Sequence, residues 1–167
     1  ATIAADTAAK LDEALANAKL TDLLKLTVNG ATASVAELNA LAAKTAVTPD
    51  AIKVDAKEIT GTGAELVALY ANAKFDNLGN ENVKVTNNNA TLAQINSVLD
   101  ATTGVVTASA TGLASDLANA VTGLTKATAK DKLTLTVTNE AGATLTKAAD
   151  LLALDDKTAV KVDATGI

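Results

Sequence analysis

The stretch Ile52-Lys53-Val54-Asp55-Ala56 carries the pattern from which the fold can be predicted, because related stretches return along the whole chain. Its apolar and polar side chains alternate, as on a β-strand with one buried face and one face in water. The related stretches are residues 24–28, 83–86, 106–109, 133–137 and 160–164. A strand that returns at intervals of about 27 residues indicates an array of stacked units.

A short helical phrase separates successive strands, most clearly in Ala64-Glu65-Leu66-Val67-Ala68-Leu69. Similar phrases occupy residues 36–41 and 93–98, and looser ones occupy residues 115–117 and 149–154. Apolar residues at i, i+3 spacing predict a narrow inward stripe on each helix. Ser34, Thr62 and Thr91 precede their helices by one or two residues, where an N-cap belongs.

Turns are expected between strand and helix, because Asn, Gly and Thr fill residues 29–30, 60–63, 87–89, 111–112 and 139–142. The phrase Lys44-Thr45-Ala46-Val47 returns as Lys157-Thr158-Ala159-Val160, and residues 103–113 form a third version. A strand, a helix and a parallel strand form a right-handed crossover. The sequence therefore predicts an α/β fold: a right-handed β–α superhelix, or solenoid, of about five to six irregular repeats with a parallel sheet on one face.

We expect one repeat domain over residues 1–167, with residues 1–22 as an N-terminal helix or cap. Residues 7–19 contain strong helix formers, and Leu11 and Leu15 share a face at i, i+4 spacing. The first residue is not Met and the last copy of the pattern stops within a unit. We therefore expect the chain to be a segment of a longer protein.

Composition argues against catalysis. The chain has no His, Cys or Arg, and its 14 cationic side chains are all Lys. The commonest general base, the thiolate nucleophile and the usual ligands of zinc, copper and haem are thus missing, as is the bidentate phosphate clamp of arginine. We expect no enzymatic activity, no cofactor and no metal site.

Charge and hydropathy limit the classes of binding partner and the cellular location that we expect for this chain. A net charge of −5 argues against binding to nucleic acid or to anionic membranes. No apolar run approaches the roughly 20 residues that span a bilayer, so we expect no membrane insertion. A chain without cysteine cannot form wrong disulfides outside the cell, which suits an extracellular location.

Four phrases, at residues 62–70, 78–85, 91–96 and 102–106, resemble degenerate repeats of very large bacterial secreted or cell-surface proteins. These are the adhesins, haemolysin-like proteins and surface-layer proteins exported by type I secretion. The resemblance implies an extracellular, repetitive, non-catalytic segment. The architecture also resembles leucine-rich repeats, although the Leu-x-x-Leu-x-Leu-x-x-Asn consensus is absent. The ligand-binding properties of the concave face of leucine-rich repeats are therefore not expected of this chain. The Gly-Gly-x-Gly-x-Asp calcium repeats of such secreted proteins are absent as well.

The polar face of the predicted sheet is the candidate binding surface. It could form a shallow strip for a glycan or a neighbouring subunit, or a solvated face with weak cross-strand pairs, and we favour the solvated face. Its residues are Lys53, Asp55, Lys84, Thr86, Thr107, Ser109, Thr134, Thr136, Lys161 and Asp163.

Other candidate residues have simpler interpretations. Asp155, Asp156, Asp76 and Glu81 lack the converging spacing that calcium requires, so we interpret them as surface charge. We expect the two aromatic residues, Tyr70 and Phe75, to form a local hydrophobic plug.

The sequence thus predicts a non-catalytic structural or adhesive segment: a spacer, adhesin stalk or surface-layer component. Its expected partners are neighbouring repeats of the parent chain. The alternative is a recognition module that binds glycan or protein on the exposed sheet face.

Overall fold

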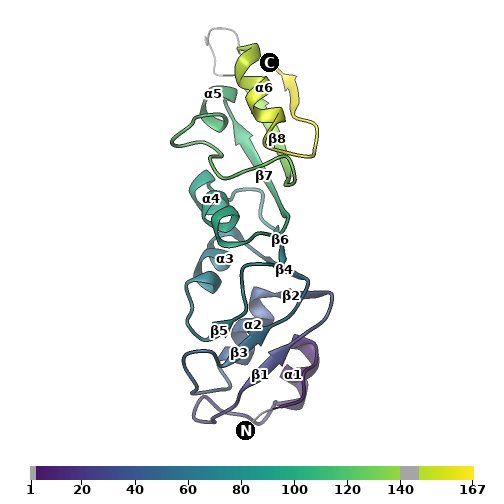
Figure 1. Cartoon of the computed structure of the whole chain (residues 1–167), viewed down its shortest axis with the longest axis vertical. Coiled ribbons are helices and arrows are strands. Elements are labelled where there is room, and N and C mark those ends of the chain that lie inside the picture. Colours follow the sequence, from purple (N-terminus) through teal and green to yellow (C-terminus); the bar gives the residue numbers. More distant parts are fainter. Residues whose placement is uncertain (1–2, 140–146) are drawn as a thin grey trace.

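The computed structural model describes residues 3–139 and 147–167. The molecule is elongated, and its two termini lie at opposite ends of the long axis (Figure 1). After the first helix of the described chain, either one strand or two consecutive strands precede each helix, and the helix returns the chain to the next strand.

The described strands are β1 (Leu26–Val28), β2 (Thr32–Ser34), β3 (Ile52–Val54), β4 (Glu58–Gly61), β5 (Phe75–Asp76), β6 (Asn82–Val85), β7 (Val106–Gly112), β8 (Lys132–Thr138) and β9 (Asp163–Gly166). The described helices are α1 (Ala8–Ala14), α2 (Val35–Ala42), α3 (Gly63–Tyr70), α4 (Leu92–Ala101), α5 (Ala114–Leu117) and α6 (Ala148–Asp155).

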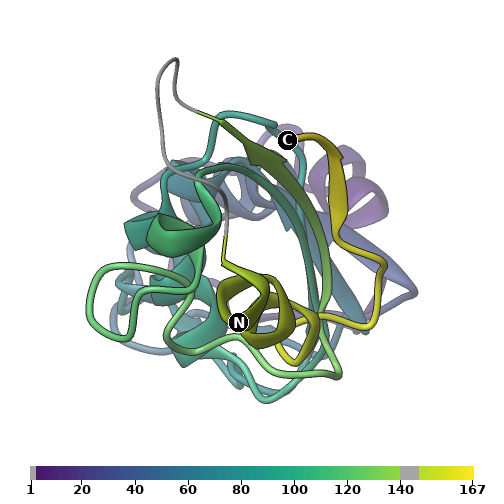
Figure 2. The ribbon, with the colours of Figure 1, turned by 90° about the horizontal axis from the view of Figure 1, so that it is seen from above.

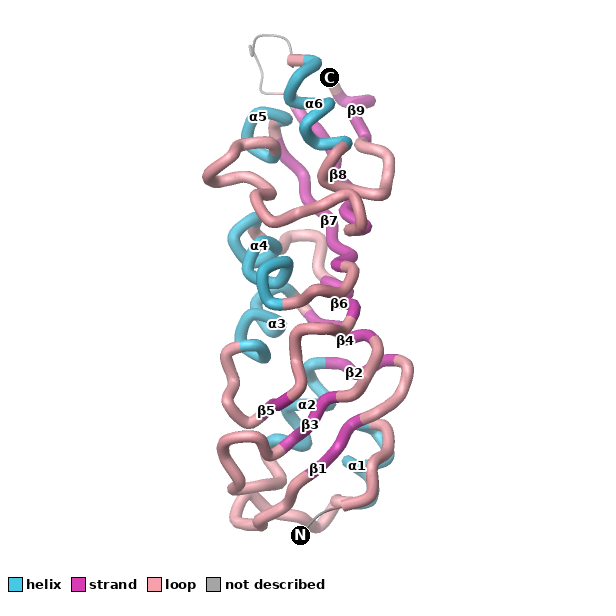
Figure 3. Tube along the Cα trace, viewed as in Figure 1, coloured by secondary structure: helices cyan, strands magenta, loops and turns pink. Residues whose placement is uncertain are grey.

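These strands form two sheets in which every pair is parallel, so the predicted α/β class with parallel pairing is confirmed. The smaller sheet has the order β1-β3-β5, and the larger has the order β2-β4-β6-β7-β8-β9. The helices α3, α4 and α5 stack along one side of the molecule, and β6 to β9 lie along the other (Figure 3). Seen down the long axis, the larger sheet is a curved layer with helices on its inner side (Figure 2).

The prediction of a single sheet is wrong for the N-terminal half of the chain. There the chain bends after its first strand and forms a second one, so β3 continues through a corner at residues 55–57 into β4. β6 pairs with β4, whereas β3 pairs with β1 and β5. The similar stretches Ile52-Lys53-Val54 and Val83-Lys84-Val85 therefore belong to different sheets.

The predicted helical phrases are confirmed in α2 to α6, and the three predicted N-caps are confirmed as well. The hydroxyls of Ser34, Thr62 and Thr91 accept backbone N–H groups at 3.2, 3.3 and 3.2 Å. In each case the Glu or Gln at the third helical position accepts the N-cap N–H in return, which completes a capping box. This reciprocal bonding satisfies amides that a helix start otherwise leaves unpaired.

The core is a set of aliphatic columns that run along the axis. Each inward side chain lies beside its counterpart on the next strand, as in the column Ala33, Ile59, Val83 and Val106. The helices close the core with leucines and isoleucines that are fully buried, including Leu66 and Ile95 at 0% exposure. Phe75 is buried in β5 beside Ile52, in keeping with the predicted plug.

Several predicted boundaries are wrong. The sequence places residues 60–61 in a turn, but they end β4. Gly61 leaves room for the side chain of Val35, since a Cβ at residue 61 would lie 2.7 Å from Cγ2 of Val35. Residues 111–112 likewise end β7 rather than form a turn. The last strand runs from Asp163 to Gly166, so Val160 and Lys161 precede it. The N-terminal helix covers only Ala8–Ala14 of the expected residues 7–19, and most of the turn expected at residues 139–142 lies outside the described residues.

Candidate functional site

The outer face of the larger sheet brings part of the predicted surface together. Residues of neighbouring strands align in the row Ser34, Thr60, Lys84, Thr107 and Lys132. Strand spacing places the two lysines roughly 10 Å apart, on either side of Thr107. Neither lysine forms a salt bridge with the described residues. The row therefore presents hydroxyls and two ammonium groups to solvent.

A second part of this face groups hydroxyls with one carboxylate. Thr134 lies beside Ser109, and Thr136 lies between Thr111 and Asp163. The Asp163 carboxylate accepts the backbone N–H and the hydroxyl of Thr165 at 3.0 and 2.8 Å. These two hydrogen bonds hold the pKa of Asp163 below its usual value. These hydroxyls and the Asp163 carboxylate therefore lie near the edge strand of the larger sheet, where Asp163 already accepts hydrogen bonds from Thr165.

The remaining predicted residues lie apart from these rows. Lys53 and Asp55 belong to the smaller sheet and its corner, and they pair with each other at 3.0 Å. Thr86 follows β6, and its N–H donates to the carbonyl of Gly61 at 2.9 Å. Lys161 is exposed near the C-terminal end. The predicted strip is thus divided among separate places along the molecule.

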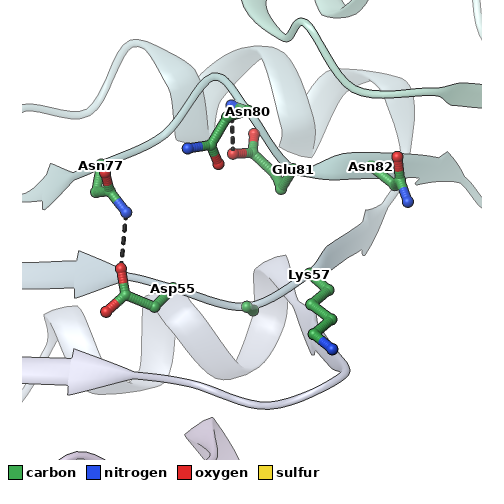
Figure 4. Close-up of a pocket in the computed structure, with 7 residues that line it drawn as sticks. Asp55, Lys57, Asn77, Asn80, Glu81 and Asn82 are labelled. Carbon is green, nitrogen blue, oxygen red and sulfur yellow. Dashed lines mark hydrogen bonds between the residues drawn. The ribbon is translucent and has the colours of Figure 1, made fainter.

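A polar hollow of about 350 Å³ lies where the two sheets meet. It is lined by Asp55, Ala56, Lys57, Asn77, Asn80, Glu81 and Asn82. Figure 4 shows Asp55 and Asn77 facing each other from neighbouring chain segments, joined by a hydrogen bond of 2.7 Å, with the Lys57 ammonium directed away. Pockets for small organic ligands are mostly apolar, so the lining of this hollow differs from that of a typical ligand pocket. Of the predicted residues, only Asp55 lines it.

Glu81 is a correction to the sequence interpretation, because it is buried at 3% exposure rather than part of the surface charge. Its carboxylate accepts the Tyr70 hydroxyl and the backbone N–H groups of Gly79 and Asn80, the latter two at 2.9 and 3.1 Å. Burial, followed by the hydrogen bond and the negative charge of Glu81, raises the pKa of Tyr70 well above its usual value. These hydrogen bonds indicate that Glu81 stabilises this corner of the chain.

The phrase Lys-Thr-Ala-Val proves to be a hydrogen-bonded clasp between neighbouring units. The hydroxyl of Thr45, which is fully buried, donates to the Leu24 carbonyl at 2.8 Å and accepts the Leu24 and Val47 N–H groups at 3.1 and 3.2 Å. The hydroxyl of Thr158 repeats this arrangement with Leu133 and Val160. The repeat in sequence is therefore a repeat in bonding.

A related clasp precedes the third version of the phrase. Thr102 donates to the Glu81 carbonyl at 2.6 Å and accepts the Gly104 N–H at 3.0 Å. Gly104 must be glycine here, because a Cβ would lie 2.1 Å from the Glu81 oxygen. The lysines before Thr45 and Thr158 add a second link, since Lys44 and Lys157 donate to the carbonyls of Leu15 and Leu124 in the preceding unit.

Within residues 3–139 and 147–167, no group of three or more acidic side chains could hold a metal ion. No helix in these ranges is long and apolar enough to cross a bilayer. Comparisons of the chain with family models, with curated proteins and with solved structures gave no match.

Sequence reasoning missed the residues that organise these places. Lys57, Asn77 and Asn80 are scattered in the sequence and meet only because two corners stack. The clasp threonines did leave a signal, since their phrase repeats, but their burial could not be predicted from composition. A threonine that recurs ahead of three strands, β3, β7 and β9, is the pattern that could have revealed them.

Proposed function

We propose that this chain is a non-catalytic structural or adhesive segment of a secreted bacterial cell-surface protein. Its units form a right-handed β–α superhelix similar in plan to leucine-rich repeats, and they serve as a spacer, adhesin stalk or surface-layer component. The proposal rests on one observation above all: strands pair with the corresponding strand of the next unit, in parallel, from one end of the larger sheet to the other.

Linear pairing has a mechanical consequence. Helices stack in the same order, with α2 on α1, α3 on α2, α4 on α3 and α6 on α5. The clasps of Thr45, Thr102 and Thr158 also bind three of the units to their predecessors. A chain built from such nearest-neighbour contacts gains length with every unit and needs no central core. This property suits a spacer that holds other domains away from a surface.

The second candidate is a recognition module for glycans. The polar hollow at the corner favours it, because Asp55, Asn77 and Asn80 offer carboxylate and carboxamide groups that hydrogen-bond to hydroxyls. The outer row with Lys84 and Thr107 could extend such contacts. The hollow lacks an aromatic side chain among its lining residues, so a sugar ring has no stacking platform there.

Binding of the chain to a glycan array separates the two candidates. The spacer predicts no saturable binding by the wild type. Saturable binding that disappears in the Lys53→Ala/Lys84→Ala variant or in Asn77→Ala would contradict the spacer and support the recognition module. Antibodies against the chain should label intact, unpermeabilised cells of its source; labelling only after permeabilisation would contradict the surface location.

A further inference from the structure

The turn between β6 and α4 contains a tripeptide to which the proposed function gives no role, Asn89-Ala90-Thr91. An asparagine followed two residues later by Ser or Thr, with any residue except Pro between them, is the acceptor pattern for attachment of a sugar to the asparagine. No other asparagine of the chain is followed by Ser or Thr in this way. A transferase can use the pattern on a folded protein only where its two outer residues are accessible, so their exposure matters here.

The two outer residues of the tripeptide face solvent, and the middle residue packs inward. Asn89 and Thr91 are exposed, whereas Ala90 is only partly exposed. Gly63, the first residue of α3, makes room for Ala90, since a Cβ at residue 63 would lie 3.0 Å from the Cβ of Ala90. The turn therefore packs on the preceding helix through Ala90 and presents Asn89 and Thr91 outward.

Hydrogen bonds fix this turn and leave the acceptor nitrogen of Asn89 free. The Asn87 carboxamide accepts the Gly63 N–H at 2.9 Å and donates to Oδ1 of Asn89 at 2.7 Å. The Asn89 carboxamide is thus held by its oxygen, and its Nδ2 has no hydrogen-bond partner among the described residues. An N-linked sugar is attached to this nitrogen. The structure therefore leaves the acceptor nitrogen of an exposed side chain without a competing hydrogen bond.

Thr91 differs from the other two N-cap residues in a way that suits recognition. The hydroxyls of Ser34 and Thr62 donate to the glutamates of their capping boxes at 2.7 and 2.9 Å. In α4 that glutamate is replaced by Gln94, and the Thr91 hydroxyl accepts the Gln94 N–H at 3.2 Å but donates to no described residue. Because a hydroxyl carries one donor, the Thr91 proton is available to an enzyme that recognises this position.

We propose that Asn89 is an attachment site for an N-linked sugar. In the transfer, Nδ2 of Asn89 forms a bond to the anomeric carbon of the sugar and loses one proton to the transferase. The bond from this carbon to a phosphate oxygen of the glycosyl diphosphate donor breaks, and the diphosphate leaves with the electron pair. The inference rests on the proposed cell-surface function, because this acceptor pattern marks surface loops of secreted proteins.

The position of the site is compatible with a spacer. β6 and α4 lie midway along the molecule (Figure 1). β6 pairs with β4 and β7, and α4 packs on α3 and β7. Asn89 belongs to none of these elements, so a sugar on it leaves strand pairing and helix stacking in place. The sugar would form a bulky hydrophilic branch on the surface of the array.

Mass spectrometry of the chain purified from whole cells of its source tests the attachment. Electron-transfer fragmentation, which keeps sugars on their residues, should locate a hexose or a larger sugar on Asn89 of the wild type. Asn89→Gln removes the acceptor and should carry no sugar. Asn88→Gln is the matched control, since Asn88 is equally exposed but lies outside the pattern, and it should be modified like the wild type.

Two substitutions of Thr91 separate the modification from the helix cap. Thr91→Ser keeps the acceptor pattern and the N-cap hydroxyl, so the sugar should be retained. Thr91→Asp keeps a strong N-cap but breaks the pattern, so the sugar should be lost while circular dichroism shows an unchanged fold.

An unmodified Asn89 in the wild type would overturn the proposal, as would a sugar that stays on Asn89 in Thr91→Asp. The surface location is measured separately by antibody labelling of intact cells. A chain that is labelled at the surface but carries no sugar therefore refutes only the attachment site, whereas labelling only after permeabilisation contradicts the proposed function.

Discussion

Replacement of Thr158 by valine tests whether the clasps hold neighbouring units together. Valine has nearly the shape of threonine but cannot hydrogen-bond. Thr158→Val removes the acceptor of the Leu133 N–H at 2.9 Å and of the Val160 N–H at 3.1 Å, and the donor to the Leu133 carbonyl at 2.8 Å. Thr158 itself is only 6% exposed, so water cannot readily take its place.

The magnitude follows from which groups lose their partner. Leu133 is 1% exposed, and an unsatisfied buried N–H costs about 1–3 kcal/mol. The lost hydroxyl donor bond adds about 1 kcal/mol, whereas Val160 is 36% exposed and its N–H can bond to water. We expect Thr158→Val to lower the free energy of unfolding by about 2–4 kcal/mol, a large share of the 5–15 kcal/mol typical of a domain.

Urea unfolding followed by circular dichroism measures this loss as a lower midpoint at unchanged slope. Thr45→Val should behave alike, because the Thr45 hydroxyl bonds in the same way to Leu24 and Val47. Thr134→Val is the control, since Thr134 is exposed on the outer face of β8 and should change stability by less than about 0.5 kcal/mol. The clasp reasoning is refuted if both buried variants are as stable as this control.

Three further predictions concern single residues. Leu66→Asp should unfold the protein at ambient temperature, because it places a carboxylate at a fully buried position. Ala68→Asp, on the exposed side of the same helix, is the control. If both variants have the same melting curve, the assignment of Leu66 to the core is wrong. Tyr70, the only tyrosine, should show no tyrosinate absorbance in the folded protein at about pH 10, the usual pKa of a tyrosine hydroxyl. Because the folded pKa of Tyr70 is raised, its contribution to stability is present below about pH 10 and is lost as pH rises further. Formation of tyrosinate in the native protein at about pH 10 would contradict this. Carbon-13 NMR should find the pKa of Glu65 below its ordinary value, since the backbone N–H and then the hydroxyl of Thr62 donate to its carboxylate. The stabilisation is present above the unfolded pKa and is lost as pH falls through the folded one, and a Glu65 pKa at or above the ordinary value would contradict the assignment.

The helices were predictable because local chemistry determines them. Ser34, Thr62 and Thr91 cap helices through residues three positions away, and this spacing is visible in the sequence. The alternation around Ile52 also predicted one buried and one exposed strand face correctly. Both signals depend on side chains near one another in the chain.

The division into two sheets could not be predicted in the same way. Ile52-Lys53-Val54 and Val83-Lys84-Val85 have the same alternation, but which strand each one pairs with depends on corners elsewhere in the chain. Thr60 and Gly61 resemble turn residues, yet they end β4, and residue 61 is glycine because Val35 occupies the space that a Cβ would fill. The candidate surface was divided for the same reason, since Lys53 and Lys84 were aligned by pattern and lie in separate sheets.

Buried polar groups were the other gap. A carboxylate such as Glu81 is expected at the surface, and only the three-dimensional arrangement shows Tyr70, Gly79 and Asn80 converging on it. Thr45 and Thr158 resemble ordinary loop threonines for the same reason. Their partners lie more than 20 residues away in the preceding unit, beyond the reach of local pattern.

Stretching single molecules between handles at the two ends tests the central claim most directly, namely that the units depend chiefly on their immediate neighbours. The account predicts stepwise unfolding, in which each step releases about one unit of roughly 27 residues and lengthens the chain by roughly 90–100 Å. A single transition that releases the whole chain at once would contradict it, because it would show one cooperative core in place of a linear array.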